Sequence, residues 1–323
     1  MFLAKLHSFR PRALGAALSL VALATTAFVE AASSGSEGAS PAGHTQERRV
    51  VLRAPGSTMV KLIGGHFRMG STIPEVAAAQ AICRLEGRGQ ECGSSEFGDE
   101  MVAHEVMLSD FWLDRTEVSN GAYQRCVDVG GCAPPTYAAE EAWRADPDRP
   151  VTLVSWYDAA RYCAFRGARL PTEAEWERAA RGWSGRLYPW GNVYNRKVCN
   201  HGRFALDELD DGDGYAELAP VDAYPEGRTP EGIANLAGNV EEWVADWYAA
   251  GYPEADTVDP QGPAMGDYRV VRGGSYVRGR AWMRGAQRGK DAASSRSPYR
   301  GFRCAKSDRP PPLPDDLPDR ATP

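Results

Sequence analysis

The most restrictive feature of this chain is its content of residues that interrupt regular structure: 34 glycines and 23 prolines in 323 residues. Both residue types weaken helix and strand interiors, which argues against an all-α protein. After residue 183 there is no long helical pattern, and aromatic residues, glycine and asparagine dominate. The hydrophobic fraction of 43% is nevertheless that of a globular protein. We therefore expect an α+β domain with a few short helices, short twisted strands and long structured loops.

The two ends of the chain predict segments outside this domain. Residues 1–31 have basic residues, then an apolar stretch, then a small-residue cleavage site, which is typical of a secretory signal peptide; an uncleaved anchor is the alternative. Residues 32–56 predict a flexible linker, and the proline-rich residues 307–323 predict a disordered tail. One domain over 57–306 remains. We expect a secreted or periplasmic protein with no membrane span after signal cleavage.

Charge is unevenly distributed along the sequence. The net charge of −6 argues against a nucleic-acid binder. Residues 269–306, however, hold eleven Lys or Arg and one acid, Asp291. Either these residues pair with the acidic remainder of the chain, or they form a surface for an anionic ligand or acidic peptide.

Export permits disulfides among the seven cysteines. Cys83 and Cys92, and likewise Cys126 and Cys132, are close enough in sequence to pair across short loops. One cysteine must remain unpaired or pair between chains, and no C-x-x-C motif is present.

Local signals place several elements. Residues 59–69 predict two short strands with a tight turn, and 105–113 predict another strand. Helices are expected over 120–129 after Ser119, and after the capping signals that start at Ser155 and Thr172. Gly167 and Gly182 should end the last two helices.

The usual catalytic signatures are missing from the sequence. It contains no H-E-x-x-H motif, and Ser275 lies in a segment that lacks the second glycine of a nucleophile elbow. Oxygen ligands are more abundant: residues 207–213 (DELDDGD) suit a hard cation such as Ca²⁺, or form a solvated acidic loop. Residues 235–243 (NLAGNVEEW) offer a second oxygen-rich set, or a helix start capped by Asn.

Seven ordered motifs resemble the formylglycine-generating enzymes, the sulfatase-modifying factor family. They are GGHFRMGS (64–71), HEVMLSDFWLDRTEVSNGAY (104–123), PVTLVSWYDAARYCAFRGARLPTEAEWERAARG (150–182), YPWGN (188–192), NLAGNVEEW (235–243), VVRGGSY (270–276) and YRGFRCA (299–305). The resemblance implies a single C-type-lectin-like domain, two bound Ca²⁺ ions and a Cys163–Cys304 disulfide. By motif position one ion would be held by Asn200, the His201 carbonyl, Asp213 and the Tyr215 carbonyl, and the other by Asn235, the Gly238 and Val240 carbonyls, and Glu242.

The sequence departs from the family at the centre of its chemistry. The resemblance implies two cysteines after the GGSY motif, which bind copper and oxidise a substrate cysteine to formylglycine with O₂. Here Arg278 and Met283 occupy these two positions, and Glu241 replaces a motif tryptophan. Ser275, an accessory residue, is retained. A guanidinium has no lone pair to offer a metal. We therefore expect no copper binding and assign no catalytic residues.

The sequence therefore predicts a pseudoenzyme that binds a peptide or protein, with acidic partners favoured by Arg278, Arg280 and Arg284 in the former substrate groove. An active oxidase of the family type is one alternative. A lectin-like glycan-binding protein that stacks sugars on Trp183, Trp190 or Trp282 is the other.

Overall fold

The computed structural model describes residues 58–86, 92–136, 142–202, 210–252 and 257–307. The chain divides into two units, Met1–Arg49 and Val50–Pro323, and every described residue belongs to the second. The predicted signal peptide and linker, and the predicted tail beyond Ser307, lie outside the described residues. Within the described ranges, no helix has both the length and the apolar character needed to cross a membrane.

Three small sheets form the centre of the second unit. Four strands pair in the order β7-β6-β5-β8, with β8 parallel to β5 and the other pairs antiparallel; their bounds are β5 (Glu241–Trp247), β6 (Arg269–Arg272), β7 (Arg288–Asp291) and β8 (Arg300–Phe302). A second sheet has the order β1-β4-β9, from β1 (Met59–Leu62), β4 (Phe111–Asp114) and β9 (Ala305–Ser307). The third pairs β2 (Gly65–Met69) with β3 (His104–Leu108).

The predicted strands exist, and each of them pairs with a strand from elsewhere in the chain. Residues 59–69 contain β1 and β2, yet β1 pairs with β4 and β2 with β3, so the two strands lie in different sheets. The single strand expected over 105–113 is two strands. The chain breaks at Ser109, whose N–H and Oγ both donate to the Asp259 carboxylate at 2.6 Å. A contact across 150 residues thus ends β3, which no local pattern reveals.

Capping signals located three helices correctly. Ser119 caps α3 (Asn120–Asp128), and capping boxes open α5 (Trp156–Phe165) and α6 (Glu173–Arg181). Gly167 and Gly182 follow these helices with φ of 65° and 61°, a conformation that favours glycine.

The 14-residue helix α1 (Ile73–Glu86) is not among the predicted helices. Its capping signal is nevertheless present, because Thr72 N–H donates to Glu75 Oε2 at 2.7 Å and Glu75 N–H to Thr72 Oγ1 at 3.4 Å. The remaining short elements are α2 (Ser94–Phe97), α4 (Ala142–Ala145), η1 (Gly98–Glu100) and η2 (Pro225–Gly227).

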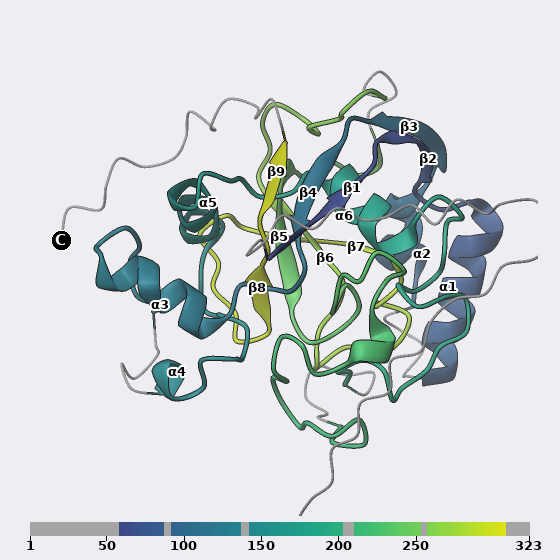
Figure 1. Ribbon diagram of the computed structural model, residues 1–323. Coiled ribbons are helices and arrows are strands. Elements are labelled where there is room, and N and C mark those ends of the chain that lie inside the picture. The colour runs from purple at the N-terminus through teal and green to yellow at the C-terminus, as the bar shows by residue number, and fades with distance from the viewer. Residues whose placement is uncertain (1–57, 87–91, 137–141, 203–209, 253–256, 308–323) are drawn as a thin grey trace, which may run out of the picture. The chain divides into compact units, whose positions relative to one another are not determined.

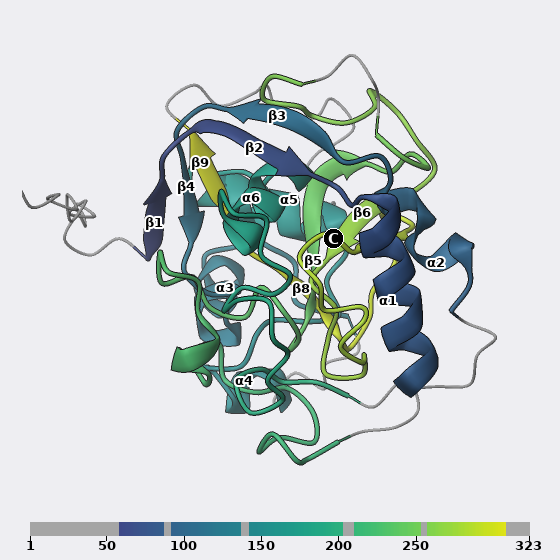
Figure 2. The same cartoon turned by 90° about the vertical axis from the view of Figure 1, so that its right-hand side faces the viewer.

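Buried tryptophans join the loops to the sheets. Trp156 Nε1 donates to the Val244 carbonyl at 2.7 Å, and Trp243 Nε1 to the Val154 carbonyl at 3.2 Å. These indoles belong to the core between α3, α5 and the four-stranded sheet. Helices α3, α4 and α5 lie on one side of the central strands and α1 on the other (Figure 1). After the quarter turn of Figure 2, α1 stands beside α2.

All three expected disulfides are confirmed: Cys83–Cys92, Cys126–Cys132 and Cys163–Cys304. The last joins α5 to the segment between β8 and β9, across 141 residues. Disulfides form and persist in oxidising compartments, so the protein belongs in such a compartment.

Candidate functional site

The loop after β6 carries the two positions where the family resemblance implies cysteines. It starts at Gly273 and Gly274, with φ of 96° and 66°. A Cβ on Gly274 would lie 2.9 Å from the Trp282 carbonyl oxygen and 3.2 Å from Met283 Cγ. Glycine is therefore required where the chain returns on itself, and this return places Met283 against the start of the loop.

Arg278 and Met283 occupy different environments on this loop. The Arg278 side chain is 26% exposed, with Nε 3.7 Å from Glu241 Oε1. Met283 is fully buried in a cluster with Tyr188, Cys199 and Ala237. Met283 Cε also fills the space beside Gly238, where an added Cβ would approach it to 2.3 Å. The first position thus faces solvent and an acid, whereas the second is core.

Two nucleophilic groups lie near this loop. Ser275 is fully buried, and its Oγ has no hydrogen-bond partner within the described part of the chain. Cys199 is the unpaired cysteine of the described residues. Burial raises the pKa of the Cys199 thiol to about 12. Reactive cysteines have lowered pKa values and solvent access, so Cys199 is an unreactive thiol at neutral pH.

The basic segment 269–306 is paired internally, which is the first of the two alternatives stated above. Eight of its arginines form ion pairs with acids: Arg272, Arg278, Arg280, Arg284, Arg288, Arg296, Arg300 and Arg303. Most of these side chains are buried. The segment is therefore chiefly an internal charge network rather than an open basic surface.

The three arginines expected in the groove separate into two groups. Arg280 is 32% exposed and pairs with Glu86, the last residue of α1, at 2.8 Å. Arg284 is 1% exposed and forms two hydrogen bonds with the buried Glu100. Its charge is fully used inside the protein, so the expectation that Arg284 attracts an acidic partner is corrected. Arg278 and Arg280 remain at the surface.

The first calcium position has donors that fit a cation. The Asp213 side chain is fully buried, and it accepts the N–H of His201 at 2.7 Å and of Tyr215 at 3.0 Å. Asn200 Nδ2 donates to the Glu217 carbonyl at 2.7 Å and to Asn239 Oδ1 at 2.9 Å. Asn200 Oδ1 is buried and has no hydrogen-bond partner among the described residues. A buried carboxylate and an unsatisfied amide oxygen are donors that suit a hard cation.

The second calcium position is more crowded. Both oxygens of Glu242 accept from Arg303, at 2.6 and 2.7 Å, and Oε2 also accepts from Trp176 Nε1 at 2.9 Å. Glu117 lies alongside and accepts from Asn235 Nδ2 at 3.0 Å. Two buried carboxylates thus share one guanidinium, and burial raises the pKa of Glu117 to about 7. Arg303 already hydrogen-bonds to both carboxylate oxygens of Glu242, so a cation at this position would have to share Glu242 with the guanidinium.

Glu117 is a further candidate site residue, which the sequence motifs alone do not indicate. It lies more than 115 residues from both of its amide partners, Asn235 and Asn239. Glu117 lies in the sequence motif of residues 104–123, but only the fold brings it into contact with the motif of residues 235–243. Gly238 and Val240 lie in that second motif as expected, with φ of 85° at Gly238.

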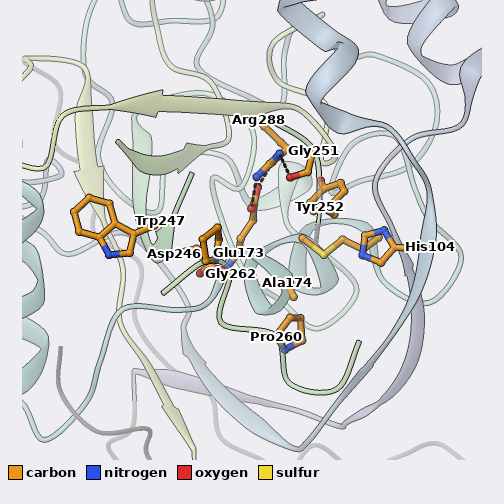
Figure 3. A pocket seen from close by; sticks show the side chains of 12 residues that line it. His104, Glu173, Ala174, Asp246, Trp247, Gly251, Tyr252, Pro260, Gly262 and Arg288 are labelled. Carbon is orange, nitrogen blue, oxygen red and sulfur yellow. Dashed lines mark hydrogen bonds and ion pairs between the residues drawn. The ribbon is translucent and has the colours of Figure 1, made fainter. Parts of the chain in front are cut away.

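A small enclosed space of about 20 Å³ lies at the start of α6 (Figure 3). Glu173 accepts two hydrogen bonds from Arg288, at 2.7 and 2.9 Å, and its N–H donates to Asp246 Oδ2 at 2.7 Å. Burial raises the pKa of Asp246 to about 8. The Tyr252 hydroxyl has no hydrogen-bond partner in the described ranges. One water molecule needs roughly 10–15 Å³, so this space suits a structural water rather than a substrate.

The tryptophans proposed for sugar stacking are mostly engaged. Trp282 is 5% exposed. Trp190 stacks on Tyr188 with ring centroids 5.3 Å apart. Trp183 is 45% exposed, but the Arg178 guanidinium lies 3.7 Å from its ring centroid. Trp282 is thus closed to a sugar, while Trp190 and Trp183 each have one ring face covered, by Tyr188 and Arg178 respectively.

Comparisons with known proteins agree with this architecture. The chain matches the "Sulfatase-modifying factor enzyme 1-like domain" over residues 46–308. The formylglycine-generating enzyme of Bos taurus is 30% identical over 332 residues, covering 84% of this chain and 82% of the relative. That of Streptomyces coelicolor is 35% identical over 298 residues, covering 76% and 88%.

Two further relatives bear on the fold and on activity. "Inactive C-alpha-formylglycine-generating enzyme 2" of Mus musculus is 42% identical over 166 residues, which is 49% of each chain. The solved structure of PvdO from Pseudomonas aeruginosa has a TM-score of 0.60 at 25% identity and covers 76% of this chain and 93% of that one. The α+β, C-type-lectin-like fold expected from the sequence is confirmed. Together with the motifs on β6 and the 235–243 segment, these matches show that the chain belongs to the sulfatase-modifying factor family of the formylglycine-generating enzymes.

Proposed function

We propose that this protein is an exported, calcium-stabilised family member without formylglycine-generating activity, which binds an acidic peptide or protein segment beside Arg278 and Arg280. The observation that carries the proposal is the chemistry of one loop, with a guanidinium at 278 and a buried thioether at 283. A guanidinium stays protonated and cannot ligate a metal. A thioether is a soft ligand but has no thiol to exchange or oxidise to a disulfide.

The remaining thiol does not compensate for this loss. Cys199 is buried, and its pKa of about 12 keeps it protonated at neutral pH. Copper(I) favours thiolate ligands, so the donors around the loop do not suit the family's copper chemistry. The half-chain likeness to a relative named as inactive supports the same conclusion.

The proposed binding surface combines two partly exposed arginines with a hollow that is lined by both apolar and polar side chains. Arg278 and Arg280 are partly exposed, and their acidic partners, Glu241 and Glu86, are ones that a ligand carboxylate can replace. Helix α1, which ends at Glu86, also borders a cavity of about 290 Å³. This cavity is lined by Glu75, Ala78, Ala79, Ile82, Gly185, Leu187, Asn192 and Arg284. This surface therefore fits a peptide in which an acidic residue stands next to an apolar residue.

Export and calcium binding belong to the same proposal. The disulfides support an oxidising compartment, and the N-terminal pattern supports secretion or transfer to the periplasm. The buried, unsatisfied oxygen of Asn200 and the buried carboxylate of Asp213 support a calcium ion.

The activity claim is tested with a peptide that carries Cys-x-Pro-x-Arg, the substrate motif of the family. The purified protein is incubated with Cu(I), O₂ and a reductant, and mass spectrometry follows the peptide cysteine. We expect no conversion. The double variant Arg278→Cys/Met283→Cys is expected to gain Cu(I) binding. Conversion by the unmodified protein would sink the proposal, and Cys199 would become the first residue to mutate.

The binding claim is tested with an acidic peptide library and isothermal titration. Arg278→Glu and Arg280→Glu are each expected to weaken the selected peptide by about tenfold or more, because like charges then oppose each other. Lys290→Glu makes the same charge change on β7 of the same basic segment and serves as the matched control. Equal affinity in all three variants would place the binding surface elsewhere.

A further inference from the structure

We propose that Arg178 and Arg186 form a site for a small oxyanion of the sulfate or phosphate class, which competes with the side chain of Glu231 for the two guanidinium groups. Arg178 lies on α6, Arg186 follows that helix, and Glu231 lies in the loop after η2. The site shares no residue with the 275–283 loop or with either proposed calcium position. The inference therefore does not rest on the function proposed above.

Two positive charges share one negative charge at this place. Glu231 Oε1 lies 3.6 Å from Arg178 Nη1, and Glu231 Oε2 lies 3.8 Å from Arg186 Nη2. Within the described residues, no other acid comes within 4.0 Å of either guanidinium. Because the Glu231 carboxylate faces both groups, the two guanidiniums border a common space in which one positive charge is not compensated.

The hydrogen-bond donors at this place lack partners. Both contacts with Glu231 are too long for hydrogen bonds. In the described ranges, Arg178 Nε and Nη1, Arg186 Nε and Glu231 Oε2 are buried and have no hydrogen-bond partner. The Arg178 side chain is only 2% exposed. Nearly all buried polar groups in proteins are hydrogen-bonded, so these donors indicate a ligand that brings acceptor oxygens to them.

Electrostatics distinguish this pair of arginines from the ion-paired ones. At Arg303 burial opposes the charge, but the adjacent carboxylate of Glu242 outweighs burial and raises the pKa of the guanidinium. At Arg178 and Arg186 burial lowers the pKa of the guanidinium, and the more distant Glu231 does not offset it. An anion in hydrogen-bond contact would supply the stabilisation that these two charges lack.

The surroundings of the two guanidiniums favour a small ligand. The Trp183 ring covers Arg178, with its centroid 3.7 Å from Arg178 Cζ. Access remains on the side of Arg186 and Glu231, whose side chains are 15% and 24% exposed. Guanidinium groups bind oxyanions through charge-assisted N–H···O bonds. When Glu231 turns outward to solvent, two guanidiniums balance the two negative charges of sulfate.

The competing explanation is a set of ordered water molecules that bridges the three side chains. Isothermal titration of the whole protein with sodium sulfate or sodium phosphate, at constant ionic strength, distinguishes the two explanations. We expect one saturable oxyanion per chain. Arg186→Gln should weaken its binding by about tenfold or more, because a hydrogen bond to a charged group is lost. Glu231→Gln should strengthen binding, because it removes the competing charge.

The matched control is Arg296→Gln, which makes the same charge change at an arginine paired with Asp158. It is expected to keep the wild-type affinity. Thermal unfolding alone is not sufficient, because sulfate stabilises proteins in general through its exclusion from their surfaces. Circular dichroism verifies that each variant is folded before titration.

Four results would overturn the proposal. They are the lack of saturable oxyanion binding by the wild type, equal affinity in wild type and Arg186→Gln, unchanged or weaker binding in Glu231→Gln, and chloride binding as tight as that of sulfate. The third result decides the question even where Arg186→Gln does not fold. None of these results bears on peptide binding beside Arg278 or on calcium.

Discussion

Individual arginines in the 269–306 segment show how burial changes the contribution of a charge to the stability of the fold. Arg284 and Glu100 are both almost completely buried and share two hydrogen bonds. Arg280 and Glu86 form a pair of the same kind at the surface. Removing one partner of a buried pair leaves an uncompensated charge, whereas solvent replaces the partner of an exposed one.

Arg284→Ala is therefore expected to lower the free energy of unfolding by about 3–5 kcal/mol. Arg280→Ala, the matched control, should change it by about 1 kcal/mol or less. Urea unfolding followed by tryptophan fluorescence measures both. Similar losses in the two variants would contradict the buried character of the Arg284–Glu100 pair.

Asp246 predicts a dependence of stability on pH. Its pKa is raised to about 8 by burial and by the neighbouring Glu173, against about 3.9 in an unfolded chain. Between these values the folded state binds more protons than the unfolded state, so stability falls as pH rises from about 4 to 8. Asp246→Asn should keep an acceptor for Glu173 N–H and reduce this fall.

The measurement is the free energy of unfolding of wild type and Asp246→Asn at pH 5 and pH 8. The difference between the two proteins should be larger at pH 8. Asp146→Asn, at an exposed carboxylate beside Arg149, is the control and should follow the wild type. A constant difference across this range would mean that Asp246 is ionised throughout.

At the scale of elements, helices and strands differ in how far their signals extend. Each predicted helix begins at a capping residue whose hydrogen-bond partner lies within four positions in the sequence, as for Thr172 and Glu175. The strands are short, and their partners are set by contacts such as Ser109 with Asp259. The sequence therefore located three capped helices and the strands of residues 59–69, but it revealed neither α1 nor the partners of β1 and β2.

Disulfides connect these elements across very different chain lengths. Cys163–Cys304 closes 141 residues and Cys126–Cys132 closes six. In the chain-entropy account, a longer closed loop removes more freedom from the unfolded state.

Replacing both cysteines of Cys163–Cys304 by serine should cost about 5 kcal/mol, against about 2 kcal/mol for Cys126–Cys132. Thermal unfolding of the two double variants compares them directly. The bridges have comparable burial, which makes the short one a suitable control. Equal losses would indicate that native packing, rather than loop length, decides the effect.

At the scale of the whole folded unit, the two proposed cation positions join segments that are distant in sequence. His201, which follows Asn200, meets Asp213 in one, and the 235–243 motif meets Glu117 in the other. Gly238 allows the Asn200 carbonyl to approach the second motif, since a Cβ there would lie 2.1 Å from that oxygen. Calcium is thus expected to stabilise the loop-rich half as one unit.

Adding Ca²⁺ at about 100 times its dissociation constant should raise the free energy of unfolding by about 2.7 kcal/mol per site. Mg²⁺ should stabilise less, because it keeps its waters and prefers a tighter octahedron. Thermal unfolding with Ca²⁺, Mg²⁺ or EDTA tests this, and Asp213→Asn should reduce the calcium effect. An unfolding temperature that ignores calcium would contradict the proposed role.

Features that depend on neighbours in the chain or on ordered motifs can be predicted from the amino-acid sequence. These are the capped helices, the two short-loop disulfides, the family and, through Arg278 and Met283, the changed chemistry of its central loop. Tertiary structure decided which acid each arginine meets: Glu100 lies 184 residues from Arg284. It also buried Asp246 and Cys199 and brought Glu117 to Asn235. Burial and long-range pairing arise from packing between distant segments, and no local pattern encodes them.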